Sequence, residues 1–164
     1  MLQTVTSNAT FDPVLTFNSD VGFDLGLSPD KKSFTARFGG LEVIIGGTSA
    51  PPIVTRVFSF SIPLKDTEPG QEIPFFVQGF AELGKGASAH LVFTVNDQSA
   101  MAYIPPGLKD DAPIRDGFVH RLDYKATGAA EAKVTVFLLV NRDSKSGSGA
   151  YLNVSTIDTD ITKH

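Results

Sequence analysis

The stretch FDLGLSPDKKSFTARF, residues 23 to 38, decides the fold class of this chain. Apolar side chains occupy every second position on both sides of its centre: Phe23, Leu25 and Leu27 before it, then Phe34, Ala36 and Phe38 after it. Alternate side chains of an extended strand point to opposite faces, so each of these sets shares one face. Pro29 and Asp30, which lie between the two sets, are typical turn residues. The stretch therefore predicts a β-hairpin with one buried face.

The same period of two recurs along the rest of the chain, where no long segment shows the helical period of 3.6. The segments with the strand pattern are VFSFSIPL (57–64), IPFFVQGFAEL (73–83), AHLVFTV (89–95) and AYLNVSTIDTDI (150–161). A further segment, KVTVFLLV (133–140), is apolar on both faces from Val136 to Val140. A strand of that kind is typically covered on both sides, and we expect this one to be so.

Two of these segments contain an irregularity. Gly79 lies inside a long strand pattern, which indicates a β-bulge or a close approach of another backbone. In the last segment Leu152 and Val154 share a face, but Ile157 falls on the other one. A bulge or twist near Ser155 would return Ile157 to the apolar face, so we expect one there.

These patterns together predict an all-β protein with about ten strands and little or no helix. We expect residues 1–164 to form a single antiparallel β-sandwich domain, jelly-roll-like or immunoglobulin-like in its connections. The chain contains no Cys and no Trp, so the Cys–Trp–Cys pattern of a true immunoglobulin domain is missing.

Composition limits the classes of function. The hydrophobic share of 41% and the charged share of 20% are those of an ordinary globular domain, and we expect the thirteen Phe side chains to be enclosed between the two layers. The net charge is −4 and Lys and Arg do not cluster, so no nucleic-acid partner is expected. No apolar run is long enough to span a membrane, and the N-terminus lacks the regions of a signal peptide. We therefore expect a cytoplasmic or a processed secreted protein.

The segment FVHRLDYK (118–125) tests whether His120 and Asp123 form a catalytic pair. In a strand, Phe118, His120, Leu122 and Tyr124 face one way, whereas Val119, Arg121, Asp123 and Lys125 face the other. His120 and Asp123 then point to opposite sides and cannot meet. We expect His120 to be a hydrogen-bonded histidine at the rim of the core, and we predict no catalytic residue.

The connection from Pro105 to Gly117 is the candidate binding site. Its length is near the point at which loops without secondary structure tend to be functional or disordered. The polar and aromatic side chains that we expect to contact a ligand are Tyr103, Lys109, Asp110, Asp111, Arg115 and Asp116. In the alternative interpretation, the prolines of this loop only stiffen a surface crossover between the sheets.

Metal sites find little support in the sequence. His90, His120 and His164 show no ligand spacing, and the absence of Cys excludes thiolate ligands. Calcium binds oxygen ligands, so it remains an alternative cofactor, with NDQ (96–98), KDD (109–111) and DTD (158–160) as the acidic segments. We predict no metal-ligating residue.

The function that these observations favour is a non-catalytic, lectin-like binding module that contacts a carbohydrate or a protein ligand through surface loops. An alternative is a structural or self-assembling homo-oligomeric protein. A third is a hydrolase with paired carboxylates, for instance Glu82 with an Asp from another strand. The sequence shows no nucleophile or phosphate-binding motif, so we lean towards a protein that is not an enzyme.

Overall fold

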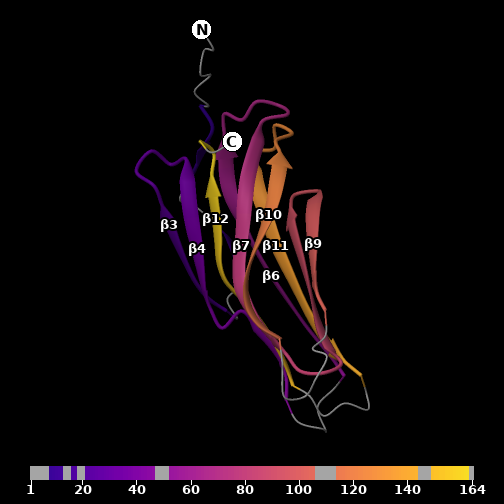
Figure 1. The fold of residues 1–164 in the computed structure, drawn as a ribbon. Coiled ribbons are helices and arrows are strands. Elements are labelled where there is room, and N and C mark those ends of the chain that lie inside the picture. The colour runs from indigo at the N-terminus through magenta and orange to yellow at the C-terminus, as the bar shows by residue number, and fades with distance from the viewer. Residues whose placement is uncertain are drawn as a thin grey trace.

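Two antiparallel sheets of six strands each account for the regular structure in the part of the chain that the structure describes. The computed structural model describes residues 8–12, 16–17, 21–46, 52–105, 114–143 and 149–162. In these ranges it contains twelve strands and no helix, hence no helix able to cross a membrane (Figure 1). The expected all-β sandwich is confirmed.

Each sheet combines strands of very different length. The first sheet has the order β1 (Thr10–Phe11), β6 (Ile53–Lys65), β11 (Glu131–Arg142), β8 (Ala87–Val95) and β9 (Gln98–Ile104), and β2 (Thr16–Phe17) also pairs with β6. The second sheet has the order β10 (Ile114–Lys125), β7 (Glu72–Leu83), β12 (Ala150–Asp160), β4 (Ser33–Gly39) and β3 (Gly22–Leu27), and β5 (Glu42–Ile45) also pairs with β12.

The connections between the strands distinguish the two predicted topologies. From β6 onward, the chain changes sheet at every connection except the β8–β9 hairpin. Four strands in each sheet consequently interleave, in the orders β6-β11-β8-β9 and β4-β12-β7-β10. This pattern of two Greek keys is that of a jelly roll rather than of an immunoglobulin domain.

The β3–β4 hairpin forms as predicted, with Phe34 and Ala36 buried. Its turn is stabilised by Ser28, whose Oγ donates to Asp30 Oδ1 over 2.6 Å and accepts from the backbone amide of Ser33 over 3.0 Å. The hydrogen bond from Ser28 lowers the pKa of Asp30. Polar side chains thus satisfy the backbone of a turn that cannot pair with a strand.

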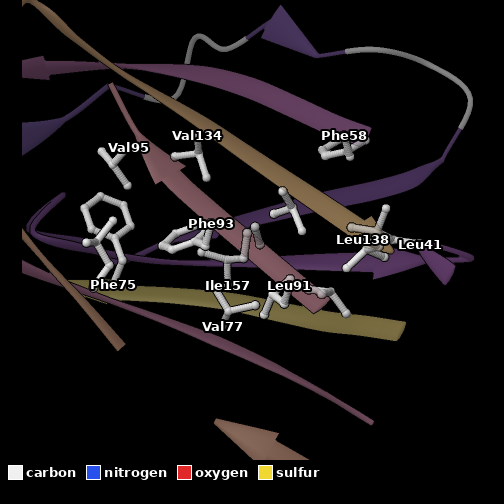
Figure 2. Packing of buried hydrophobic residues seen from close by; sticks show 14 of the residues in the cluster. Leu41, Phe58, Phe75, Val77, Leu91, Phe93, Val95, Val134, Leu138 and Ile157 are labelled. Atoms are coloured by element: carbon white, nitrogen blue, oxygen red, sulfur yellow. The ribbon is translucent and has the colours of Figure 1, made fainter. Parts of the chain in front are cut away.

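Aromatic rings from both sheets fill the core (Figure 2). Phe75 of β7 lies 6.2 Å from Phe93 of β8 and 6.3 Å from Tyr124, measured between ring centroids. The hydroxyl of the fully buried Tyr124 accepts a hydrogen bond from Asn96 Nδ2 over 2.7 Å. The expectation that every Phe is enclosed is wrong for three of them: Phe76, Phe80 and Phe137 lie at outward-facing positions of their strands.

Strand β10 follows the predicted alternation but begins earlier than expected. Ile114 to Gly117 pair with Phe80 to Leu83 of β7, so Arg115 and Asp116 belong to a strand and not to the preceding loop. His120 points inward, as predicted. The hydrogen bond expected for it is absent at Nε2, which is buried and has no partner among the described residues.

Both predicted irregularities are confirmed, and they lie side by side. The pairing of β12 with β7 shifts register between Val154 and Thr156, so Ser155 is a bulge. A Cβ atom at Gly79 would lie 2.0 Å from the carbonyl oxygen of Asn153 on β12. Only glycine allows the two backbones to approach so closely.

Candidate functional site

An open groove of about 760 Å³ crosses the outer face of the second sheet. Every strand of the sheet order contributes to its lining: Gly26 from β3, Thr35 from β4, Asp158 from β12, Gln78 from β7 and Val119 from β10. Figure 1 shows these five strands lying next to one another in this order. The groove is thus built on paired strands rather than on loops, which fixes the relative positions of its side chains.

A polar cluster at the centre of the groove surrounds the carboxylate of Asp158. Thr35 Oγ1 donates to Asp158 Oδ1 over 2.6 Å, and Gln78 Nε2 donates to Oδ2 over 3.0 Å. Thr156 Oγ1 donates to the same Oδ2 over 3.3 Å. Strand register explains the cluster, because Thr35 lies opposite Asp158 and Gln78 lies opposite Thr156. Side chains of three strands therefore hold the carboxylate in one position.

The bulge at Ser155 is what directs Asp158 into the groove. Before the bulge, Leu152 and Val154 are buried and the odd-numbered residues of β12 face outward; after it, Ile157 is buried and Asp158 faces outward. Because side chains alternate with a period of two, a regular β12 would have placed Asp158 in the core.

The groove also has apolar surface. Phe76 lies beneath the guanidinium of Arg121, whose Cζ is 5.4 Å from the ring centroid, and Val119 is 65% exposed. At the β3 end the groove stays open because Gly26 has no side chain; a Cβ atom there would find its nearest neighbour, Nη1 of Arg37, at 3.6 Å. That guanidinium is itself only 3.5 Å from Asp24, in an exposed ion pair.

An aromatic pair lies on the same outer face, two residues further along β7 than Gln78. The rings of Phe80 and Tyr151 are 6.5 Å apart, and the Tyr151 hydroxyl donates to Glu42 Oε2 over 2.9 Å. Burial, followed by the hydrogen bond to Glu42, raises the pKa of Tyr151. This pair adds aromatic surface to the outer face of the second sheet.

The residues predicted from sequence are only partly placed by the structure. Tyr103 is 55% exposed on the outer face of the first sheet, with its ring 4.8 Å from that of His90. Asp116 is exposed near the start of β10, which belongs to the second sheet. Lys109, Asp110 and Asp111 lie outside the described residues, as does the side chain of Arg115. The ligand-binding loop therefore stays a prediction.

The strand residues of the groove were missed because alternation shows which side chains face outward but not which strands are neighbours. Thr35, Gln78 and Asp158 come from three distant parts of the sequence and meet only through sheet order. One signal was present: the change of parity around Ser155 already required the acids of DTD (158–160) to face away from the core.

The two acidic side chains that line the groove are engaged with protein groups. Asp158 accepts three hydrogen bonds, and Asp160 Oδ1 accepts from both the amide and the hydroxyl of Thr162. Glu82, proposed for a hydrolase, lies opposite Tyr151, whereas the groove is lined by Asp158 and Asp160. No group of three His, Cys, Asp or Glu residues suitable for a metal ion occurs in the ranges that the structure describes. The arrangement best suits Asp158 to act as a fixed hydrogen-bond acceptor.

No protein-family model matches the chain, and no curated protein matches it. Among solved structures, the chain is similar to the enzymatically active domain of tailspike protein 4 of bacteriophage CBA120 (19% identity, TM-score 0.28). The match covers 92% of this chain but 19% of the tailspike chain. The chain is also similar to TmCBM61 in complex with β-1,4-galactotriose (11% identity, TM-score 0.34, 92% of this chain and 90% of the other). A third is the Stig cyclase Fisc from Fischerella sp. TAU (10% identity, TM-score 0.36, 97% and 92%). These TM-scores lie below 0.5, so the function of this chain has to be inferred from its own residues.

Proposed function

We propose that this protein is a non-catalytic binding module that holds a neutral oligosaccharide in the groove across β3, β4, β12, β7 and β10. The observation that carries the proposal is the carboxylate of Asp158, fixed by three strands at the centre of an open groove of about 760 Å³. A groove of this size, with a few placed polar groups and apolar surface between them, is typical of a ligand site.

The hydrogen-bonding groups of the groove match a ligand that is rich in hydroxyl groups. A carboxylate oxygen has two lone pairs, so Asp158 Oδ1 can accept from a ligand in addition to Thr35. Gln78 uses one N–H for Asp158, and its amide keeps a second N–H and an oxygen. A hydroxyl both donates and accepts, and can therefore use all of these groups.

The apolar and charged groups narrow the ligand class further. Val119, together with Phe76, whose ring also contacts the guanidinium of Arg121, lines the groove with apolar surface against which the C–H groups of a sugar can pack. Two carboxylates, of Asp158 and Asp160, line the groove against one guanidinium, that of Arg37. This balance disfavours an anionic ligand, so we expect neutral polysaccharides to bind in preference to polyuronates.

Affinity electrophoresis tests the proposal. The protein is run through native gels that contain a neutral glucan, galactan or xylan, and through a gel that contains polygalacturonate as the anionic probe. We expect at least one neutral polysaccharide to retard the wild-type protein. Gly26→Leu should abolish the retardation, because its side chain would fill the β3 end of the groove without touching the core.

Gly46→Leu is the matched control, since a Cβ atom there meets nothing within 4 Å and the position lies outside the groove. This variant should migrate like the wild type in every gel. Asp158→Ala should lose binding as well, and EDTA should change nothing because Asp158 acts without a metal. If both Gly26→Leu and Asp158→Ala are still retarded, the groove is not the binding site. If the protein releases reducing sugar from a polysaccharide, it is a hydrolase and the non-catalytic proposal is wrong.

A further inference from the structure

The outer face of the first sheet differs from that of the second in being apolar. Its central row crosses four strands in register: Val57 of β6 pairs with Phe137 of β11, which pairs with Val92 of β8, which pairs with Met101 of β9. All four side chains face away from the core, and Val57 and Met101 are 49% and 67% exposed. We call this central row, together with the row beside it, the apolar face.

The neighbouring row of the apolar face is less apolar but contains no Asp, Glu, Lys or Arg. It consists of Thr55, Leu139, His90 and Tyr103 in register across the same four strands. Beyond it Ile53, 56% exposed, lies opposite Asn141. Leu139 and Phe137 explain why β11 is apolar on both sides in the sequence. The predicted second cover is not supplied by any strand that the structure describes.

Charge is missing from this surface. The outward-facing positions of 53–59, 88–94, 99–103 and 135–141 contain no Asp, Glu, Lys or Arg. The exposed Lys133, which lies opposite Ser61, is just beyond them. Arg56, the charged residue within this part of β6, points the other way and donates to the carbonyl oxygen of Gly40 over 2.8 Å. The outer face of the second sheet, by contrast, carries Asp24, Arg37, Arg121, Asp123 and Asp158.

We propose that the apolar face binds a second copy of this chain, sheet against sheet. A two-fold interface places the same patch of both copies in contact, so any charge on it would meet a like charge. The apolar face has no charged side chain that would repel its copy, and none that could pair with a charged partner. The net charge of the chain is −4, so its charged surface repels other copies of the chain. The apolar face does not take part in this repulsion.

The size of the face sets the strength of the dimer. The two rows of the apolar face and the row on either side of them, on four strands about 4.8 Å apart, cover roughly 20 Å by 20 Å, hence on the order of 400–500 Å² per copy. Two copies would bury on the order of 800–1,000 Å², at the low end of specific interfaces. We therefore expect a dimer that dissociates on dilution. In it the two grooves face outward on opposite sides, although the pairing itself requires no ligand.

Sedimentation equilibrium from about 5 µM to about 500 µM tests the proposal without any ligand. We expect the wild-type mass to rise from the monomer value of 17.5 kDa towards twice that value as the concentration increases. Val57→Glu and Met101→Glu should each raise the dimer dissociation constant at least about tenfold, because they bury like charges at the interface. Both positions are exposed in the monomer, so folding should survive the changes.

Ile44→Glu is the matched control, being an equally exposed apolar residue, 54%, on the other sheet. It should leave the dissociation constant unchanged. A wild-type protein that stays monomeric over the whole range overturns the proposal. So does a dimer that Val57→Glu and Met101→Glu leave intact, or one that Ile44→Glu weakens equally. Since the measurement uses no polysaccharide, failure of the groove proposal would not affect it.

Discussion

Gly79 lies where the backbones of β7 and β12 come closest. A methyl group there would lie 2.0 Å from the Asn153 carbonyl oxygen and 2.7 Å from the ring of Phe118. The backbone oxygen cannot move away without breaking the sheet, so Gly79→Ala should lower the free energy of unfolding by about 3 kcal/mol or more. Guanidinium denaturation monitored by circular dichroism measures the loss.

Gly117→Ala is the control for this prediction. Gly117 lies on β10 opposite Phe80, and a Cβ atom there would have its nearest neighbour, the Gly79 carbonyl oxygen, at 3.7 Å. That is an ordinary contact, so stability should change by less than about 1 kcal/mol. Equal effects of the two substitutions would show that close approach is not the reason for glycine at position 79.

The raised pKa of Tyr151 predicts a pH dependence of stability. A group whose pKa is higher in the folded than in the unfolded state stabilises the fold below the unfolded value, about 10 for Tyr, and loses this contribution as pH rises through the folded value. Between about pH 8 and about pH 11, the wild type should therefore lose more stability than Tyr151→Phe. The measurement is the guanidinium midpoint of both proteins at the two pH values, and equal losses would contradict it.

At the residue scale, alternation predicts the facing of side chains only where apolar and polar residues alternate. It placed Phe58, Phe60 and Phe34 in the core, where they are buried. It could not assign Phe75 and Phe76, or Phe137 and Leu138, because both neighbours are apolar and either could have faced inward. Phe76, which lines the groove, and Phe137, on the apolar face, come from such ambiguous pairs.

At the element scale, β12 is the strand on which the groove depends. Its bulge at Ser155 lets Leu152 and Ile157 share the core while Asp158 faces out. Deleting Ser155 would force one end of the strand to turn over, which places either Asp158 in the core or Leu152 in water. Since a buried charge without its partners costs about 3–5 kcal/mol, the deletion should abolish cooperative unfolding or lower stability by at least that amount.

Ser155→Ala is the milder companion of this deletion. It keeps the bulge and removes only the hydrogen bond from Ser155 Oγ to the Gln78 carbonyl oxygen, 3.1 Å long, so it should cost about 1 kcal/mol. Thermal unfolding followed by calorimetry distinguishes the two variants. A deletion variant as stable as Ser155→Ala would mean that the bulge does not set the direction of Asp158.

The sequence predicts single strands and local hairpins well, but it predicts poorly which strands pair with one another in a sheet. The reason is physical. The β3–β4 hairpin is local, with turn residues between its strands, and the bulge of β12 follows from one apolar stripe. Pairing of β4, β12 and β7 depends instead on packing across the whole sandwich, so alternation within one strand carries no information about it. Lys109 to Asp111 are polar and adjacent in the sequence, so the sequence alone can point to them. The groove residues Thr35, Gln78 and Asp158 lie on strands that are far apart in the sequence.

At the scale of the whole molecule, the two sheets have outer faces of different chemistry. The second sheet presents a polar groove with Asp158 at its centre, and the first presents an uncharged apolar face around Phe137. Packing through the apolar face would make a bivalent particle, in which two weak sites act together on a long polysaccharide. The prediction is that dilution below the dimer range weakens retention on polysaccharide more than it weakens binding of a short oligosaccharide.

The most direct test of the binding site is amide chemical-shift mapping. A short neutral oligosaccharide, cut from whichever polysaccharide retards the protein most, is titrated into isotopically labelled protein. We expect the shifted amides to cluster around Thr35, Gln78 and Asp158 on β4, β7 and β12, and those of β8 and β9 to stay unchanged. Shifts centred instead on Tyr103 and the loop that follows it, or on the outer face of the first sheet, would contradict the groove as the binding site.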